Sequence, residues 1–143
     1  MRKFWIVGVM LLISIACNKD RYNPIPNISF YGTINLELPQ YNYTSFVVKY
    51  AGNVKLGHNG VVVLKLSNSN YDISAFDLMC PHEHDVPGYF YTELETNGDV
   101  EVTCPHCGSV FSLASGNPIE GPAQYGLRQY QTNLNGNYLT ISN

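Results

Sequence analysis

The residues most able to do chemistry in this chain lie in the stretch CPHCGSVF, which runs from Cys104 to Phe111. Two thiols separated by two residues can exchange with disulfides as a redox dithiol, and their thiolates can also bind a metal. A dithiol catalyst needs a long helix directly after the motif, because the helix N-terminus lowers the pKa of the first thiol. Here the motif is followed by Gly-Ser and a β-prone run without a helical pattern, which favours a metal-binding role.

A second group of metal-binding residue types lies upstream, where Cys80 and His82 form a Cys-x-His pair. This pair and the Cys-x-x-Cys pair of Cys104 and Cys107 each follow a predicted strand, and a segment with a hairpin separates them. Either pair could be accidental alone, but two such loops in one small chain are much harder to obtain by chance. The sequence therefore indicates that the two pairs contribute to one metal-binding site.

The first residues of the chain indicate export. Arg2 and Lys3 precede an uncharged run, Phe4 to Ala16, which is too short for a stop-transfer helix and is typical of a secretory signal. The run stops at Cys17, and this Ala-Cys junction resembles the lipobox of bacterial lipoproteins, in which the cysteine carries the lipid. The predicted organisation is a signal peptide at 1–16, a lipidated cysteine and tether at 17–27, and a folded domain at 28–143.

Charge and cysteine count restrict the partners. The formal net charge is −3 and becomes more negative once the signal is removed, so nothing suggests nucleic acid as a partner, and membrane attachment would come from acyl chains. With Cys17 lipidated, an odd number of cysteines remains, which does not suit a disulfide framework. We expect a lipid-anchored protein of the bacterial cell envelope that faces the periplasm or the cell surface.

The elements that must position the ligands are predicted to be strands. Past the signal no stretch keeps a helical period over ten or so residues, whereas alternation and turn residues recur throughout. Three Asn-Gly pairs suit tight hairpins, because both residues tolerate a positive φ. The predicted hairpins are Val54–Leu56 with Val61–Leu66 across Asn59-Gly60, a segment ending near Glu95 with Asp99–Thr103 across Asn97-Gly98, and Leu127–Thr132 with Tyr138–Ile141 across Asn135-Gly136. Further strands are expected at 28–38, 46–50, 71–76 and 110–113, which makes the fold class all-β and antiparallel.

Alternation along the strands also predicts which side chains face the core. Val62, Leu64 and Leu66 are expected to share one face, and Val100 and Val102 are expected to point inward. The acidic residues near the ligands are expected to form a mostly solvated edge that comprises Glu83, Asp85, Glu93 and Glu95.

Taken together, these features resemble the Rieske iron–sulfur domain, in which two loops of a small antiparallel β domain of stacked sheets carry C-x-H and C-x-x-H and hold a 2Fe-2S cluster. The resemblance covers about residues 46–142. It includes the strand from Tyr71 to Asp77 that leads into the first ligand pair. It also includes the stretch GSVFSLASGNPIEGPAQYGLRQY, from Gly108 to Tyr130, which is close to the family's text after the second pair.

This resemblance assigns Cys80 and Cys104 to one iron and His82 to the other, and His84 is an alternative to His82 after a loop adjustment. The chain departs from the family at Cys107, because the usual text C-P-x-H-G is here C-P-H-C-G, with the histidine one residue early. Neighbouring side chains point in different directions, so His106 cannot inherit the ligand role without a backbone shift. Cys107 therefore occupies the position aimed at the metal.

Such a Cys3His site predicts a low reduction potential. Two thiolates and two neutral imidazoles balance the charge of an oxidised 2Fe-2S core, whereas a third thiolate makes the site more negative and harder to reduce. The potential is expected between the Rieske range of about −150 to +300 mV and the plant-type value near −400 mV. Ser109 matches the family's serine that hydrogen-bonds a bridging sulfide, and Phe111 lacks the hydroxyl that a tyrosine supplies in other members.

In some Rieske proteins a disulfide ties the two loops, and the matching positions here are Asp85 and His106. We expect an Asp85–His106 contact to replace part of that tie, since opposite charges could pair across the same gap.

Two alternatives to a cluster stay open. The Cys3His set also suits tetrahedral zinc, which would be structural and redox-silent. A metal-free domain with a Cys104–Cys107 disulfide would suit an oxidising compartment, and the signal lacks the Arg-Arg pair of the route that exports folded cluster proteins. With a cluster, the protein would be an electron carrier or accessory subunit that docks a redox partner of unknown identity, rather than a self-sufficient enzyme. Without one, it would be a binding or assembly module on a Rieske scaffold.

Overall fold

The structure is a computed structural model, and it describes residues 23–83, 92–97 and 99–143. The strands in these ranges are β1 (Tyr31–Asn35), β2 (Ser45–Val48), β3 (Tyr50–Ala51), β4 (Val54–Lys55), β5 (Val61–Lys65), β6 (Ile73–Asp77), β7 (Glu95–Asn97), β8 (Glu101–Thr103), β9 (Val110–Ser112), β10 (Pro118–Glu120), β11 (Gln129–Asn135) and β12 (Tyr138–Ser142). Two short 3-10 helices, η1 (Pro39–Tyr41) and η2 (Asn70–Asp72), accompany them. The all-β fold class is confirmed.

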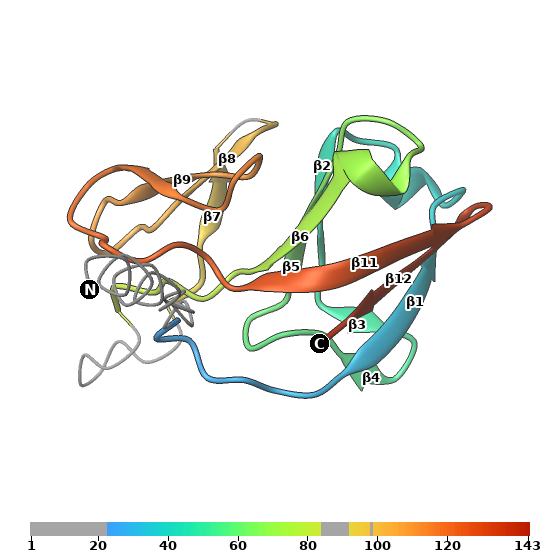
Figure 1. The fold of residues 1–143 in the computed structure, drawn as a ribbon, viewed down its shortest axis with the longest axis horizontal. Coiled ribbons are helices and arrows are strands. Elements are labelled where there is room, and N and C mark those ends of the chain that lie inside the picture. Colours follow the sequence, from blue (N-terminus) through green and yellow to red (C-terminus); the bar gives the residue numbers. More distant parts are fainter. Residues whose placement is uncertain (1–22, 84–91, 98) are drawn as a thin grey trace, which may run out of the picture.

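The strands form three antiparallel sheets. The largest has six strands in the order β1-β12-β11-β6-β5-β2, the next has four in the order β10-β9-β8-β7, and β3 and β4 form a two-stranded ribbon. Figure 1 shows the four-stranded sheet beside one end of the six-stranded sheet, with the chain passing from β6 into the smaller part and returning to β11.

Strand β5 contributes to two separate cores. It lies between β2 and β6, and its residues Val61 to Leu64 are all buried. Successive side chains of a strand point to opposite faces. Val61 and Val63 therefore join a core lined by the six-stranded sheet, whereas Val62 and Leu64 join a second core shared with the four-stranded sheet. Two of the candidate cysteine ligands belong to that second core, which gives the site an apolar foundation.

Two of the predicted core positions are wrong. Leu66 is 61% exposed, because β5 ends at Lys65 and the alternation stops with it. Val100 is 46% exposed although Val102 is fully buried, because β8 begins only at Glu101. Both errors come from extending a regular strand past its actual end.

Two of the three predicted hairpins are confirmed. Strand β7 pairs with β8 and β11 pairs with β12, each in antiparallel register. In the last hairpin Gly136 has φ +60°, as the turn requires.

The first predicted hairpin is wrong. Strand β4 pairs with β3, and β5 pairs with β2 and β6 instead. Residues 56–60 form a turn that is hydrogen-bonded to the end of β6, because the backbone N–H of His58 donates to Asp77 Oδ2 at 2.7 Å. The chain therefore leaves β4 and enters β5 without the two strands pairing.

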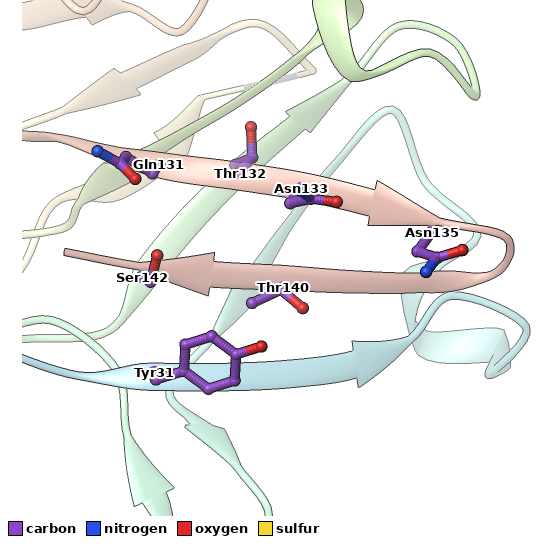
Figure 2. Close-up of a pocket in the computed structure, with 7 residues that line it drawn as sticks. All are labelled: Tyr31, Gln131, Thr132, Asn133, Asn135, Thr140 and Ser142. Carbon is purple, nitrogen blue, oxygen red and sulfur yellow. The ribbon is translucent and has the colours of Figure 1, made fainter.

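The outer face of β1, β11 and β12 carries uncharged polar side chains. A pocket of about 380 Å³ lies on this face. Figure 2 shows the residues that line it, which are Tyr31, Gln131, Thr132, Asn133, Asn135, Thr140 and Ser142. These lining residues include no thiol, imidazole or carboxylate, so the pocket does not offer the metal-binding chemistry that the sequence predicts.

Residues 23–28, here called the N-terminal strap, pack against the domain. Ile25 is fully buried, and its carbonyl accepts a hydrogen bond from Arg128 Nη1 at 3.0 Å. The other guanidinium nitrogen, Nη2, donates to Asn27 Oδ1 at 2.7 Å, and Asn23 Nδ2 donates to the Gly126 carbonyl at 3.2 Å. We expected residues 17–27 to form a free tether. Their described part, 23–27, differs from that expectation, because Ile25 is buried and Asn23, Ile25 and Asn27 are hydrogen-bonded to the domain.

The predicted signal peptide and the predicted lipidation site, Cys17, lie outside the described residues. Within the described ranges, no helix has the length and apolar character needed to cross a bilayer.

Candidate metal centre

The first ligand loop follows β6. The backbone N–H of Cys80 donates to the Thr92 carbonyl at 3.1 Å, and the N–H of Leu94 donates to the Leu78 carbonyl at 2.8 Å. These bonds fasten the start of the loop to the segment that leads into β7. A further bond from Glu83 N to the Cys80 carbonyl, at 3.3 Å, turns the chain back and leaves the Cys80 thiol fully buried.

The second ligand loop is the connection between β8 and β9, residues 104–109. The N–H of Cys104 donates to the Ser109 carbonyl at 2.8 Å, and the N–H of Gly108 donates to the Cys104 carbonyl at 3.0 Å. Gly108 has φ +73°, a conformation that glycine adopts without strain. The chain then continues into β9 rather than into a helix, so the arrangement of a dithiol catalyst is not present.

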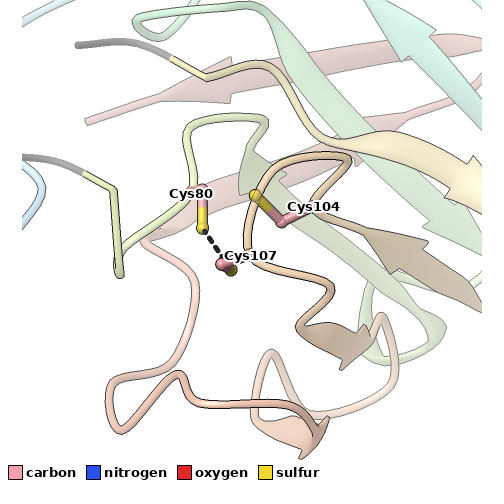
Figure 3. A group of neighbouring side chains, drawn as sticks. All are labelled: Cys80, Cys104 and Cys107. Atoms are coloured by element: carbon pink, nitrogen blue, oxygen red, sulfur yellow. Dashed lines mark hydrogen bonds between the residues drawn. The ribbon is translucent and has the colours of Figure 1, made fainter. Parts of the chain in front are cut away.

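The two loops bring three cysteine sulfurs together. The Sγ atoms of Cys80, Cys104 and Cys107 all lie within 4.8 Å of one another, and those of Cys80 and Cys107 are 3.8 Å apart. Figure 3 shows the three thiols converging from the two loops. All three are free cysteines, so the Cys104–Cys107 disulfide of the metal-free alternative is not formed in this structure.

Burial controls the ionisation of the two innermost thiols. Burial raises the pKa of the Cys80 thiol, and the adjacent Cys104 thiol raises it further. Burial likewise raises the pKa of the Cys104 thiol, although the backbone N–H groups of Cys107 and His106 act in the opposite direction. Because only thiolates bind metals, metal binding here has to displace protons.

His82 is not part of the sulfur group. His82 is exposed, and its imidazole is not among the ligand atoms that lie within 4.8 Å of one another in the described chain. His84, the alternative ligand, lies outside the described residues, as does Asp85. Ligation by His82 therefore stays a prediction.

Ser109 links the second ligand loop to a neighbouring loop by hydrogen bonds. It is fully buried, and its Oγ lies 3.1 Å from Cys107 Sγ, from which it accepts a hydrogen bond. The same oxygen accepts the backbone N–H of Ala123 at 3.0 Å. Gly121, at φ +85°, lets this covering loop approach so closely that an added Cβ would stand 2.5 Å from Ser109 Cα. Phe111 is fully buried in the core below.

A buried carboxylate, not singled out by the sequence analysis, braces the first loop. Asp77 is fully buried at the end of β6. Its Oδ1 accepts the backbone N–H of Met79 at 2.8 Å, while its Oδ2 accepts the N–H of His58 at 2.7 Å and the hydroxyl of Tyr130 at 2.6 Å. The carboxylate thus fixes the backbone one residue before Cys80. The available sequence signal was an acidic residue at the end of an apolar strand.

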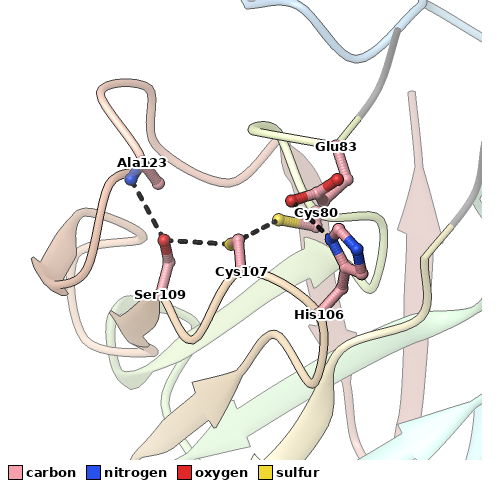
Figure 4. Close-up of polar contacts among 6 residues, drawn as sticks. All are labelled: Cys80, Glu83, His106, Cys107, Ser109 and Ala123. Atoms are coloured by element: carbon pink, nitrogen blue, oxygen red, sulfur yellow. Dashed lines mark hydrogen bonds and ion pairs between the residues drawn. The ribbon is translucent and has the colours of Figure 1, made fainter. Parts of the chain in front are cut away.

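A second buried carboxylate joins the two loops. Glu83 is only 3% exposed, and its Oε1 lies 3.0 Å from His106 Nδ1. Figure 4 shows this pair beside the Cys80 and Cys107 thiols. The prediction that Glu83 belongs to a solvated edge is therefore wrong, because the imidazole of the second loop gives the carboxylate a partner when it is buried. Glu93 does stay exposed, where it pairs with Lys49 at 2.8 Å.

The donors present fit an iron–sulfur or zinc site. Three soft sulfur donors converge from two loops, and the interior behind them is apolar. One carboxylate oxygen, Glu83 Oε2, is buried beside them without a hydrogen-bond partner among the described residues. Fold and site together define a class of protein: a small antiparallel β domain in which two loops present cysteine ligands to an iron–sulfur centre.

The comparison with protein families makes this assignment specific. The model of the Rieske [2Fe-2S] domain matches residues 43–131, so the chain belongs to this family. The matched range includes both ligand loops. The cofactor of the family is a 2Fe-2S cluster, and its chemistry is electron transfer.

Among the solved structures that resemble this chain, one supports the fold. The cyanobacterial plasma membrane Rieske protein PetC3 from Synechocystis PCC 6803 is 22% identical, with a TM-score of 0.51, and the match covers 80% of this chain and 98% of that one. A ferredoxin from Sphingomonas yanoikuyae B1 is 17% identical with a TM-score of 0.47, covering 68% of this chain and 84% of that one. No curated protein matches the sequence.

Proposed function

We propose that this protein is an envelope-anchored electron carrier or accessory subunit that binds a 2Fe-2S cluster through a Cys3His variant of the Rieske site. The observation that carries the proposal is the convergence of the Cys80, Cys104 and Cys107 sulfurs within 4.8 Å, from two loops that are distant in the sequence. The fourth ligand in the proposal is His82, which is exposed and close to solvent.

A bound cluster supplies a one-electron redox centre. The chain's own residues would set the conditions for it. The thiolates of Cys80 and Cys104 would bind the cluster on its buried side. Cys107 would supply a third negative donor, where the family has a neutral imidazole. Ser109 positions Cys107 through its hydroxyl, which Ala123 N–H orients from the opposite side at 3.0 Å. The exposed His82 marks the side on which a redox partner would dock.

The experiment for this proposal is metal and sulfide analysis of the protein purified without oxygen from its native envelope. Visible absorption together with iron and acid-labile sulfide in equal amounts supports the cluster. Protein that contains iron without sulfide, or no metal at all, contradicts it. Copurified redox proteins would then identify the partner.

We also propose that Cys17 is lipidated and holds the domain at a membrane of the bacterial cell envelope, on the periplasmic side or at the cell surface. The support for this is the sequence of the first residues, with Arg2 and Lys3, an apolar run and the Ala-Cys junction. Mass spectrometry of the N-terminal peptide tests it. A diacylglyceryl group on Cys17 supports the anchor, and an N-terminus at any other residue contradicts it.

One observation favours zinc as a second candidate. Three sulfurs bound to one tetrahedral ion at a Zn–S distance of about 2.3 Å would stand roughly 3.8 Å apart. The Cys80 and Cys107 sulfurs are 3.8 Å apart, and Cys104 belongs to the same group. In that case the protein would be a redox-silent binding or assembly module. Zinc in a one-to-one ratio, with no colour and no sulfide, would support this second candidate.

A further inference from the structure

Glu83 is a charged group in an unusual place. It lies three residues after Cys80, on the first ligand loop, and it is 3% exposed. A buried carboxylate is costly unless it is paired and hydrogen-bonded. Its Oε1 is paired with His106 Nδ1 at 3.0 Å, and its Oε2 has no hydrogen-bond partner among the residues that the structure describes.

His106 belongs to the other ligand loop, between Cys104 and Cys107. The Glu83–His106 pair therefore spans the two loops beside the sulfur group (Figure 4). The direct contact between the two loops at this point, from the Cys80 thiol to the Cys107 thiol at 3.8 Å, is a weak hydrogen bond. The imidazole is 39% exposed and the carboxylate is almost fully enclosed, so water screens this pair less than it screens a surface ion pair.

We propose that Glu83 and His106 form a clasp that holds the two ligand loops at the spacing a bound cluster requires. The clasp deepens the proposed function, on which its role in cluster retention rests. It also gives a use for the exchanged order of residues 106 and 107. With the histidine one position early, the imidazole binds the opposite loop and the thiol faces the metal. Glu83 is a positioning residue here, not a ligand.

The two single alanine variants are expected to differ. Glu83→Ala removes the clasp and its charge together, whereas His106→Ala leaves a buried carboxylate without its partner, which is the more costly change. In the full chain loaded with cluster, we expect Glu83→Ala to speed the loss of visible absorbance to excess EDTA roughly tenfold, and His106→Ala to speed it more. The double variant should lose absorbance more slowly than His106→Ala alone, because the orphaned carboxylate is gone.

Two further variants separate a clasp from a general effect of charge. Glu83→Gln keeps an oxygen that can accept from His106, so its absorbance loss should stay within about twofold of the unaltered protein. Its reduction potential should shift to a more positive value, since one negative charge beside the site has been removed. Glu95→Ala removes an exposed carboxylate from β7 and should match the unaltered protein in release rate.

Independent effects of the two alanine changes, multiplying in the double variant, would overturn the clasp, as would a Glu83→Ala protein that keeps its cluster normally. If the unaltered protein takes up no cluster, the proposed function fails by itself. The clasp is then judged by urea unfolding of the reduced, metal-free chain. Non-additive changes for Glu83 and His106 support it there, and additive changes contradict it.

Discussion

At the scale of single residues, the main departure from the Rieske pattern is at position 107, where this chain has a cysteine and the family has a histidine. We predict that Cys107→His preserves cluster loading and raises the reduction potential into the range of about −150 to +300 mV, because an imidazole replaces a negative thiolate. Redox titration followed by visible absorption measures this. A potential that stays unchanged while the cluster is loaded would show that Cys107 is not a ligand.

A second prediction for a single residue concerns the stability of the fold. The hydroxyl of Tyr130 donates a hydrogen bond to the buried Asp77 carboxylate at 2.6 Å. Replacing it in Tyr130→Phe should lower the free energy of unfolding at neutral pH by about 1.5–3 kcal/mol. Tyr31→Phe, on the exposed outer face, should change the free energy of unfolding by less than about 0.5 kcal/mol.

The same tyrosine gives the protein a dependence on alkaline pH. Burial, followed by the negative charge of Asp77, raises the pKa of Tyr130 above its usual value near 10. The unfolded chain therefore loses this proton first as the pH rises, so the stabilisation is complete below pH 10 and declines above it. Urea unfolding at several pH values should show the stability difference between the unaltered protein and Tyr130→Phe shrinking above about pH 10. A difference that grows there would contradict this assignment.

The proximity of Cys80, Cys104 and Cys107 could be predicted from the sequence, because the Cys-x-His and Cys-x-x-Cys pairs each follow a predicted strand in one small domain. The burial of Glu83 could not. Its local sequence, between two histidines, is typical of a solvated loop, and the partner that makes burial tolerable is His106, on a loop that only the folded chain brings near. Asp77 is similar, since two of its three donors come from distant parts of the chain.

At the scale of elements, the loop that contains Gly121 covers the second ligand loop. Gly121→Ala would place a methyl group 2.5 Å from Ser109 Cα and 2.8 Å from its Oγ, at a positive φ. We expect a loss of about 2–4 kcal/mol in the free energy of unfolding, together with a changed visible spectrum, because Ser109 would be displaced from Cys107. Gly136→Ala has the same kind of backbone but open space around it, so it should cost only about 1–2 kcal/mol and leave the spectrum unchanged.

Hairpins differ in how far their sequence determines them. The pairs β7–β8 and β11–β12 agree with the prediction from local turn chemistry, because in each case the two strands on either side of an Asn-Gly pair in the sequence are hydrogen-bonded to each other. The strand pair expected across Asn59-Gly60 does not form. The N–H of His58 donates to Asp77, and β5 pairs with β2 and β6. A local turn signal predicts a turn correctly, but distant strands decide which segments pair.

At the scale of the whole molecule, the N-terminal strap extends the domain beyond the predicted boundary at residue 28. Ile25→Ala should lower the free energy of unfolding by about 2–4 kcal/mol, because its side chain is fully buried. Ile119→Ala is the matched control, since that side chain is 52% exposed and should contribute little. Equal unfolding curves for the two variants would show that the strap does not hold to the domain in solution.

The strap also limits where the domain can sit if Cys17 carries the proposed lipid. From Cys17 to Asn23 the chain can extend at most about 20 Å. Asn23 is fastened to Gly126, in the same loop whose Ala123 N–H binds Ser109 beneath Cys107. The side of the molecule that carries this loop is thereby kept near the headgroups and cannot swing far from them. A partner lying on the same bilayer would meet the centre by lateral diffusion, at a fixed height, without any need to leave the membrane surface.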